Sequence, residues 1–252
     1  MILFISPKYG SRADSVKLIE AARKHHIRTE TLLNNWNNSN RVIAVNEKTA
    51  LYGERAFCEF IAQEMRWNLY QNSLNWIAGL PHAFIKRSIK YMSLEGLQKL
   101  TKSDNSICNK RILEPADEPL FSTGVYTRLP RVPSDTPILV SSVCEWAAKF
   151  RFVIIDGKVA TSCCFQIESI FNEPVIWQTN YERDGITADA FVHTLLNHVN
   201  TAPGCVIDVG YIKGSGWAVV GTQPIWSAEL YGCRPTPFLN ALFEACKQHC
   251  VL

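Results

Sequence analysis

The stretch Cys205-Val206-Ile207-Asp208-Val209-Gly210-Tyr211 sets an acid inside an apolar segment of strand length. A second apolar segment, Gly216-Trp217-Ala218-Val219-Val220-Gly221-Thr222-Gln223-Pro224, follows a turn. If the two are neighbouring strands, Asp208 faces the end of the second strand that carries Gly221 and Gln223. Carboxylate and carbonyl oxygens placed in this way can hold Mg²⁺ against phosphate groups, because this hard cation prefers oxygen ligands. The sequence therefore offers Asp208 and Gln223 as metal ligands; the alternative is that Asp208 only caps a turn.

The residues around this hairpin predict a mainly antiparallel sheet. Asp156-Gly157 between two apolar runs is a hairpin signal, since these residues tolerate the positive φ of a tight turn. The expected strands are 136–143, 150–155, 159–166, 205–212 and 216–220, and the expected helices are 187–199 and a closing helix over 238–250. Strands paired in this way, with helices on one side, predict an α+β fold.

The N-terminal third alternates between strand and helix patterns. Residues 2–5 form a short apolar run that Pro7 and Gly10 end, which predicts a buried strand. Helical patterns follow over 14–23, 54–65 and about 81–100, strand patterns over 27–33 and 41–45, and an Asn-rich loop over 34–40. We therefore expect a small α/β unit with a helical segment over residues 1–103, and a second region over residues 104–252.

The composition is that of a globular protein. The 252 residues are 47% hydrophobic and 19% charged, which is too apolar for a disordered chain. No apolar run reaches the ~18–20 residues of a membrane-spanning helix, and residues 1–8 lack the basic start of a signal peptide. The formal charge of +3 is weak evidence for nucleic acid, whose binders usually carry a basic stripe. We expect a cytoplasmic protein with no membrane partner.

Nine cysteines and six histidines show no metal-ligand spacing. The cysteine count is odd and no Cys-x-x-Cys pair occurs, which favours buried, reduced thiols over a disulfide framework or a zinc site. The chain also lacks the Gly-x-Ser-x-Gly elbow, the phosphate-loop lysine motif and the Gly-x-Gly-x-x-Gly fingerprint. Common motifs for hydrolysis and nucleotide binding are therefore excluded.

Ten short stretches, in order along the chain, resemble the ATP-grasp superfamily, in particular its bacterial and phage clade named for one arginine and two lysines. They include Glu114-Pro115-Ala116-Asp117-Glu118, Phe150-Arg151-Phe152-Val153, Val206-Ile207-Asp208-Val209-Gly210 and Leu230-Tyr231-Gly232-Cys233. The resemblance implies a small α/β unit followed by two α+β lobes that hold ATP and Mg²⁺ between them. It also implies a reaction in which a carboxylate is activated as an acyl phosphate and joined to an amine or thiol.

The resemblance assigns roles to single positions. Arg151 and Asp208 keep the residues of the family pattern and are the expected catalytic pair. Glu114 and Pro119 stand where the pattern has lysines, Lys149 stands in place of an acid, and Ser142 replaces the hinge acid. The Glu-x-Asn metal motif reads Gly221-Thr222-Gln223. The expected nucleotide-binding residues are Glu114, Lys149, Ser142, Cys144, Lys86 and Arg87, and the expected metal ligands are Asp208 and Gln223.

These replacements change the charge that a triphosphate would meet. A carboxylate in place of a lysine turns attraction into repulsion of ~4 kcal/mol per pair of unit charges at ~4 Å, with an effective dielectric constant of ~20. Because Glu114 and Lys149 are both reversed in sign, an ion pair between them could persist with exchanged polarity.

Two functions stay open. The first is a degenerate ATP-grasp protein, a pseudoenzyme that acts by binding a protein or nucleotide partner. The second is an active ATP-dependent carboxylate–amine ligase with a rebuilt site, in which Lys86, Arg87, Lys110 and Arg111 contact phosphate; the other interpretation of these cations is a solvated face. Nucleic-acid binding rests only on the mild positive charge. A cleft lined by cations would favour the ligase, and a cleft filled by side chains would favour the binding protein.

Overall fold

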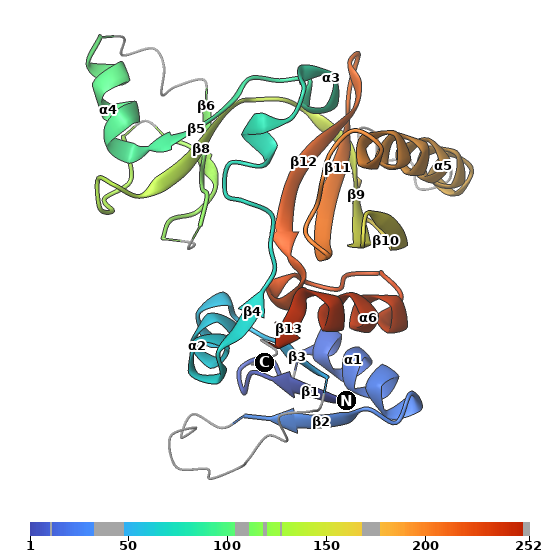
Figure 1. The fold of residues 1–252 in the computed structure, drawn as a ribbon. Helices are drawn as coiled ribbons and strands as arrows, with labels where there is room; N and C mark the ends of the chain where they lie inside the picture. The colour runs from blue at the N-terminus through green and yellow to red at the C-terminus, as the bar shows by residue number, and fades with distance from the viewer. Residues whose placement is uncertain are drawn as a thin grey trace.

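A buried parallel sheet organises the N-terminal unit of the computed structural model, which describes residues 1–10, 12–32, 48–103, 111–117, 120–126, 128–167 and 177–248. Strand β1 (Ile2–Ile5) is buried along its whole length and pairs in parallel with β2 (Arg28–Thr31) and β3 (Thr49–Tyr52). Helices α1 (Ala13–Lys24) and α2 (Arg55–Met65) belong to the same unit, at the bottom of Figure 1. The predicted strand over 2–5 and the two predicted helices are confirmed, whereas the predicted loop over 34–40 and strand over 41–45 lie outside the described residues.

A second, antiparallel sheet forms a small lobe at the upper left of Figure 1. Its strand order is β5 (Ile89–Ser93), β8 (Pro137–Ser142), β6 (Arg111–Pro115) and β7 (Gly124–Val125), and α4 (Leu94–Ser103) follows β5 directly. The single helix predicted over about 81–100 is wrong: α3 (His82–Ile85) is one turn long, and the strand β5 precedes α4. Residues 89–93 become a strand because they pair with β8. Since β5 precedes residue 104 and β8 follows it, one sheet draws on both sides of the predicted boundary.

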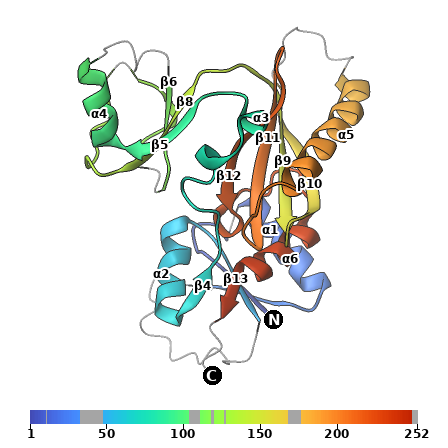
Figure 2. The ribbon, with the colours of Figure 1, turned by 45° about the horizontal axis from the view of Figure 1, so that its top comes forward.

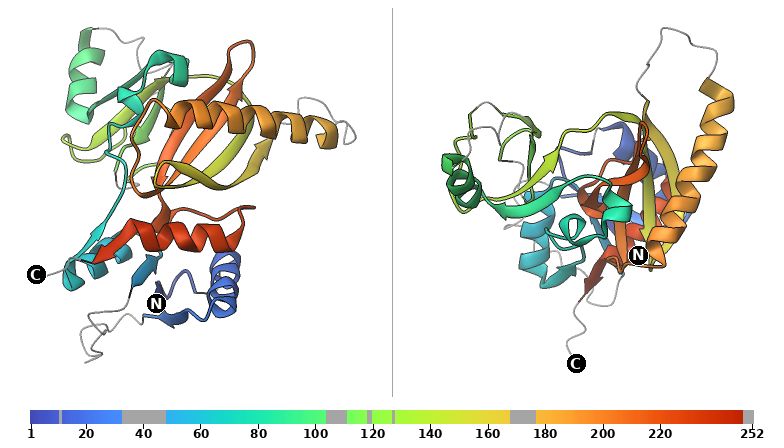
Figure 3. Two further views of the ribbon diagram at one scale, coloured as in Figure 1. Left: turned by 45° about the vertical axis from the view of Figure 1, so that its right-hand side comes forward. Right: turned by 90° about the horizontal axis from the view of Figure 1, so that it is seen from above.

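The third part is a four-stranded antiparallel sheet in the order β10 (Lys158–Ile167), β9 (Trp146–Ile155), β11 (Gly204–Ile212), β12 (Gly216–Pro224). Both predicted hairpins are confirmed, with Gly157 and Gly214 at positive φ in the turns. Figures 2 and 3 show α5 (Trp177–Leu196) along one face of this sheet and α6 (Pro235–Ala245) at the other. Alternate residues serve the two faces: Phe152 and Ile207 pack in the cluster with α5, while Val153 and Val206 pack in the cluster with α6.

The end of the chain joins the large sheet to the N-terminal unit. The short helices η4 (Ile225–Ser227) and α6 share one buried cluster with β1, β3 and α1, and the Tyr52 hydroxyl donates to the Ala228 carbonyl at 3.0 Å. Strand β13 (Cys246–Gln248) pairs with β4 (Trp67–Leu69). The predicted closing helix therefore ends at Ala245, because the next three residues form a strand. The remaining short helix of the described chain, η2 (Ile77–Gly79), lies between β4 and α3.

The α+β fold class is confirmed by this arrangement of helices and mainly antiparallel sheets. Within the described ranges, no helix combines the length and the apolar content that crossing a membrane would require.

Candidate functional site

Arg151 and Asp208 form a buried ion pair on the large sheet. They occupy paired positions of β9 and β11, so their side chains leave the sheet on the same face. Arg151 Nε donates to Asp208 Oδ1 at 2.9 Å, and Nη2 donates to Oδ2 at 2.7 Å. The two side chains are only 1% and 9% exposed. Both carboxylate oxygens of Asp208 are therefore engaged by one guanidinium in a bidentate geometry.

Arg151 forms two further hydrogen bonds and two ring contacts beside this pair. Nη1 donates to the Glu229 carbonyl at 2.5 Å, and Nη2 reaches Gln223 Oε1 at 3.2 Å. The rings of Tyr231 and Phe165 stack on each other and on the guanidinium, with centroids 4.4 Å and 5.4 Å from its central carbon. Burial alone would lower the pKa of Arg151, but the hydrogen bonds and charge of Asp208 raise it above its usual value. Arg151 is thus a fixed cation bound to an acid, an amide and a carbonyl.

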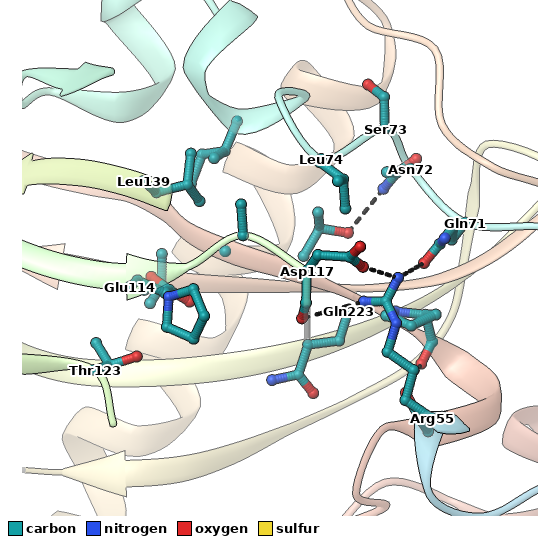
Figure 4. Close-up of a pocket in the computed structure, with 18 of the residues that line it drawn as sticks. Arg55, Gln71, Asn72, Ser73, Leu74, Glu114, Asp117, Thr123, Leu139 and Gln223 are labelled. Atoms are coloured by element: carbon teal, nitrogen blue, oxygen red, sulfur yellow. Dashed lines mark hydrogen bonds and ion pairs between the residues drawn. The ribbon is translucent and has the colours of Figure 1, made fainter. Parts of the chain in front are cut away.

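A cavity of about 480 Å³ opens where the three parts of the chain meet. Its walls come from β6 and the residues after it, from the connection between β4 and η2, from β12, and from the start of α2. Figure 4 shows Glu114, Asp117 and Gln223 around this space, with Arg55 at one side. Among the described lining residues, Arg55 is the one cation, and Glu54, Glu114 and Asp117 are the acids. Glu54 is paired with Lys8, which is not a lining residue, and Asp117 is paired with Arg55. The lining therefore carries more acids than bases.

Arg55 forms ion pairs and hydrogen bonds with neighbouring side chains. Its guanidinium forms an ion pair with Asp117, donates to Glu59 at 2.8 Å and donates to Gln71 Oε1 at 3.2 Å. The dashed lines of Figure 4 mark the contacts to Asp117 and Gln71. Because the charge of Arg55 is balanced by carboxylates, it leaves little positive potential for an anionic occupant.

Glu114 lies on the small lobe and faces the cavity. Solvent reaches its side chain, yet the surrounding walls desolvate the carboxylate and raise its pKa; Arg87 opposes this increase more strongly than Lys149 does. The ion pairs of the described residues do not include one between Glu114 and Lys149, so the compensation expected from the sequence is not seen as a direct contact. Lys149 Nζ lies 5.9 Å from the centre of the Trp146 ring.

Arg87 fills space beside the large sheet rather than facing the cavity. It donates to the carbonyls of Val219 at 2.6 Å and Val220 at 2.9 Å, and its guanidinium lies 4.9 Å from the centre of the Trp146 ring. The same ring covers Gly210, where a Cβ would come within 2.3 Å of it. Burial lowers the pKa of Arg87. The Arg87 guanidinium is therefore bound to the edge strand β12 and to an aromatic ring.

The comparisons with known proteins agree with this architecture. A family model described as an ATP-grasp domain, family 2 of the clade named for one arginine and two lysines, matches residues 120–241. This match, together with the fold, supports membership of the ATP-grasp superfamily. The sequence matches no curated protein. The match to the family model covers β8 to β12, which carry Arg151, Asp208 and Gln223.

Solved structures show the same ATP-grasp fold at low sequence identity. D-cycloserine synthetase DcsG aligns with a TM-score of 0.52 and 12% identity, covering 97% of this chain and 99% of that one. N5-carboxyaminoimidazole synthase from Aspergillus clavatus, solved in complex with ADP and an aminoimidazole ribonucleotide, aligns with a TM-score of 0.51 and 10% identity; the alignment covers 96% of this chain and 76% of that one. A RimK domain protein from Sphaerobacter thermophilus aligns with a TM-score of 0.50 and 11% identity, covering 97% of this chain and 99% of that one.

The residues of this ATP-grasp chain fit ATP and Mg²⁺ poorly. Both oxygens of Asp208 are bound by Arg151, and Gln223, which is neutral, contacts the same arginine. In the described part of the chain, no group of three or more His, Cys, Asp or Glu side chains is placed to hold a metal ion. A hard divalent cation needs free oxygen ligands and negative charge to replace its water. We therefore derive no catalytic step through a metal or a nucleotide.

The other predicted nucleotide-binding residues are Ser142, Cys144 and Lys86, of which Cys144 lies within reach of the charges of Arg87 and Lys149. Ser142 accepts a hydrogen bond from Arg111 at 2.8 Å at the end of β8. Cys144 lies between β8 and β9, and burial raises its pKa. Lys86 donates to the Ser215 carbonyl at 2.5 Å, at the far end of the β11–β12 hairpin. The structure thus brings Arg151, Asp208 and Gln223 together and leaves these three apart from them.

Sequence analysis missed Glu229, Phe165 and Arg55 at the site, and it named Tyr231 only within a stretch that resembles the family. Glu229, Tyr231 and Phe165 enclose Arg151, and no local pattern gives them this role because they act through contacts across the fold. Arg55 had one signal, its spacing of four residues from Glu59 on a predicted helix.

Proposed function

We propose that this chain is a non-catalytic ATP-grasp protein, a pseudoenzyme that acts by binding a partner protein. The observation that carries the proposal is the bidentate Arg151–Asp208 pair. The acid that would hold Mg²⁺ gives both oxygens to a buried guanidinium, and freeing it would leave that cation without its partner. The ATP-grasp framework is kept, while the group that would bind the metal serves to hold two strands together.

The charge of the cavity supports the same proposal. Of the three acids that line it, Glu54 is paired with Lys8 at 3.6 Å and Asp117 with Arg55, so Glu114 is the lining acid that forms no ion pair among the described residues. A polyphosphate brings several negative charges, and a close pair of one of them with ionised Glu114 is unfavourable by ~4 kcal/mol at ~4 Å with an effective dielectric constant of ~20. A neutral or basic segment of a partner suits these walls better than a nucleotide does.

The alternative of a rebuilt ligase site is weakened by the contacts of its candidate cations. Lys86 and Arg87 donate to carbonyls of the β11–β12 hairpin, and Arg111 donates to Ser142. Lys110 lies outside the described residues. The three described cations are therefore bound within the protein and do not line the cavity.

Isothermal titration with Mg-ATP, combined with a phosphate-release assay in mixed pools of amines and carboxylates, tests the proposal. We expect neither a binding isotherm at micromolar concentrations nor phosphate release above the buffer rate. The matched variant is D208N, which has nearly the same shape without the charge. Micromolar binding of Mg-ATP with turnover that D208N abolishes, while circular dichroism shows D208N to be folded, would overturn the proposal and establish the ligase.

A further inference from the structure

Two buried cysteines approach each other beside the Arg151 cluster. Cys163 lies on β10, and Cys233 lies in the turn between η4 and α6, 70 residues later. Their sulfur atoms are 3.2 Å apart, and the residues are 7% and 3% exposed. Cys233 Sγ is also 4.0 Å from the Arg151 carbonyl. The two thiols therefore face each other directly in the fold.

The backbone on both sides of the pair is fastened, so the short distance does not depend on a loose side chain. The Arg234 amide donates to Thr161 Oγ1 at 3.1 Å, and the Arg234 guanidinium donates to the Ala160 carbonyl at 3.3 Å. A Cβ at Gly232 would lie 3.3 Å from Cys163 Cβ, so the turn passes close over β10. Closing the gap between the sulfurs to the ~2.05 Å of a disulfide requires a side-chain rotation and a small shift of the turn.

We infer that Cys163 and Cys233 are a redox modification site, at which a hydroperoxide oxidises the two thiols to a reversible disulfide. The Cys163 thiolate attacks the peroxide oxygen, forming a sulfenic acid and releasing water or an alcohol after protonation. The Cys233 sulfur then displaces the hydroxyl as water, which forms the S–S bond. In total, two thiols and one hydroperoxide give one disulfide, one water and one alcohol, or two waters when the oxidant is hydrogen peroxide. A dithiol reductant reverses the reaction by exchange.

The surroundings make Cys163 the attacking thiol. A hydrogen bond from the Cys233 thiol lowers the pKa of Cys163 to about 7, and the Gly232 amide and the charge of Arg151 act in the same direction against burial. The pKa of Cys233 is raised, because it holds the proton that the pair shares. The thiolate is the reactive form, so the first step belongs to Cys163 and the resolving step to Cys233.

The disulfide would tie the turn to β10 next to the site. The same turn supplies the Glu229 carbonyl and the Tyr231 ring to Arg151, and the Leu230 amide donates to Asp14 on α1 at 2.8 Å. Oxidation would therefore link to β10 the turn that supplies these contacts to Arg151. This inference stands independently of the proposed function, because it concerns two thiols that the ion pair does not use.

Peptide mapping of the peroxide-treated whole chain tests the inference. After alkylation of free thiols, trypsin releases residues 159–183, which contain Cys163 and Cys164, and residues 214–247, which contain Cys233 and Cys246. We expect a linked pair of these peptides that disappears with dithiothreitol. The matched control is C164S, because Cys164 neighbours Cys163 but packs in the cluster on the other face of the sheet.

The variants assign the link to single residues. C164S should keep the linked pair at wild-type yield, whereas C163S and C233S should lose it. If these two variants fail to fold, fragmentation of the wild-type linked peptides gives the same assignment. A link through Cys164 or Cys246, oxidation of Cys163 to sulfinic acid without a link, or no linked pair in wild type would each overturn the inference.

Discussion

Arg151 and Asp208 oppose each other across β9 and β11 and are joined by two parallel hydrogen bonds in a site that water hardly reaches. The pair makes each partner dependent on the other, since either charge alone would be buried without compensation. Two residues that match the ATP-grasp pattern therefore stabilise the sheet through their contact with each other.

Removing either charge of this pair should destabilise the protein strongly. We expect R151M and D208L each to lower the free energy of unfolding by about 3–5 kcal/mol, because each leaves an isolated buried charge. The double variant R151M/D208L should lose less than the sum, since no charge is left unpaired. Urea unfolding followed by fluorescence and circular dichroism measures all three. Losses that simply add in the double variant would contradict a direct coupling.

The control for these Arg151 and Asp208 variants is an exposed ion pair on α4. Lys99 Nζ and Glu95 Oε1 are 2.7 Å apart at a spacing of four residues. Ion pairs in contact with water contribute little, because hydration and salt replace the interaction. E95Q should leave the unfolding midpoint unchanged within error. A loss as large as that of D208L would show that burial is not what gives the Arg151–Asp208 pair its importance.

Two glycines on neighbouring strands should respond oppositely to the same substitution. A Cβ at Gly204 would come within 2.3 Å of the Ala241 carbonyl on α6, whereas a Cβ at Gly221 has nothing within 4 Å. We therefore expect G204A to lower the free energy of unfolding by about 1–3 kcal/mol through overpacking. G221A should change it by less than about 0.5 kcal/mol. Thermal unfolding checks both, and equal effects would contradict the close approach of α6 to β11.

Sequence patterns predicted correctly those elements that are determined by their own residues. The two hairpins of the large sheet were predicted because Asp156-Gly157 and the turn at Gly214 mark their positions. Strand β5 was mistaken for helix because its identity depends on β8, which lies more than forty residues later. Strand β13 was missed for the same reason, since its partner β4 is distant in sequence.

The strand pairing around Asp208 was predicted, whereas the contacts of its side chain were not. Strand spacing placed Asp208 beside Gln223, and the structure brings both to Arg151. Asp208 binds the guanidinium of Arg151, which lies on a third strand, β9. The spacing of residues along β11 and β12 does not predict this contact. The contact between Cys163 and Cys233 was not predicted from the number and spacing of the cysteines, because seventy residues separate the two.

Glu114 should make stability depend on pH. Desolvation raises its pKa in the folded protein above the usual glutamate value, so the folded state keeps the proton over a window in which the unfolded state has released it. Stability from this group is therefore full below the unfolded pKa and is lost as pH rises through the folded pKa. Because solvent reaches the side chain, the effect should be small. E114Q should raise Tm slightly at about pH 8, with the difference from wild type vanishing near about pH 4.

Differential scanning calorimetry of both proteins across this range measures the difference. A Tm gain for E114Q that grows towards acid would contradict the raised pKa. The comparison of variants is needed because other carboxylates titrate in the same range, and subtracting the two curves isolates Glu114.

Gly221 offers a direct test of whether one added carboxylate gives this fold a Mg²⁺ site. It pairs with Asp208 in the register of β12 and β11, and the space beyond its Cα is open. G221E places a second carboxylate beside Asp208, while G221Q adds the same bulk without charge. Arg151 can neutralise only one of two acids, so the variant gains the net negative charge and free oxygen ligands that this ion requires.

We expect Tm of G221E to rise with MgCl2, and Tm of wild type and G221Q to stay constant. Binding to the folded state alone would add about 2.7 kcal/mol at a Mg²⁺ concentration of about 100 times Kd. A shift in wild type equal to that of G221E would mean that Asp208 already leaves Arg151 for the metal, which contradicts the closed pair. An absence of any shift in G221E would mean that more than one carboxylate separates this site from a metal centre, because the charge alone would then be insufficient.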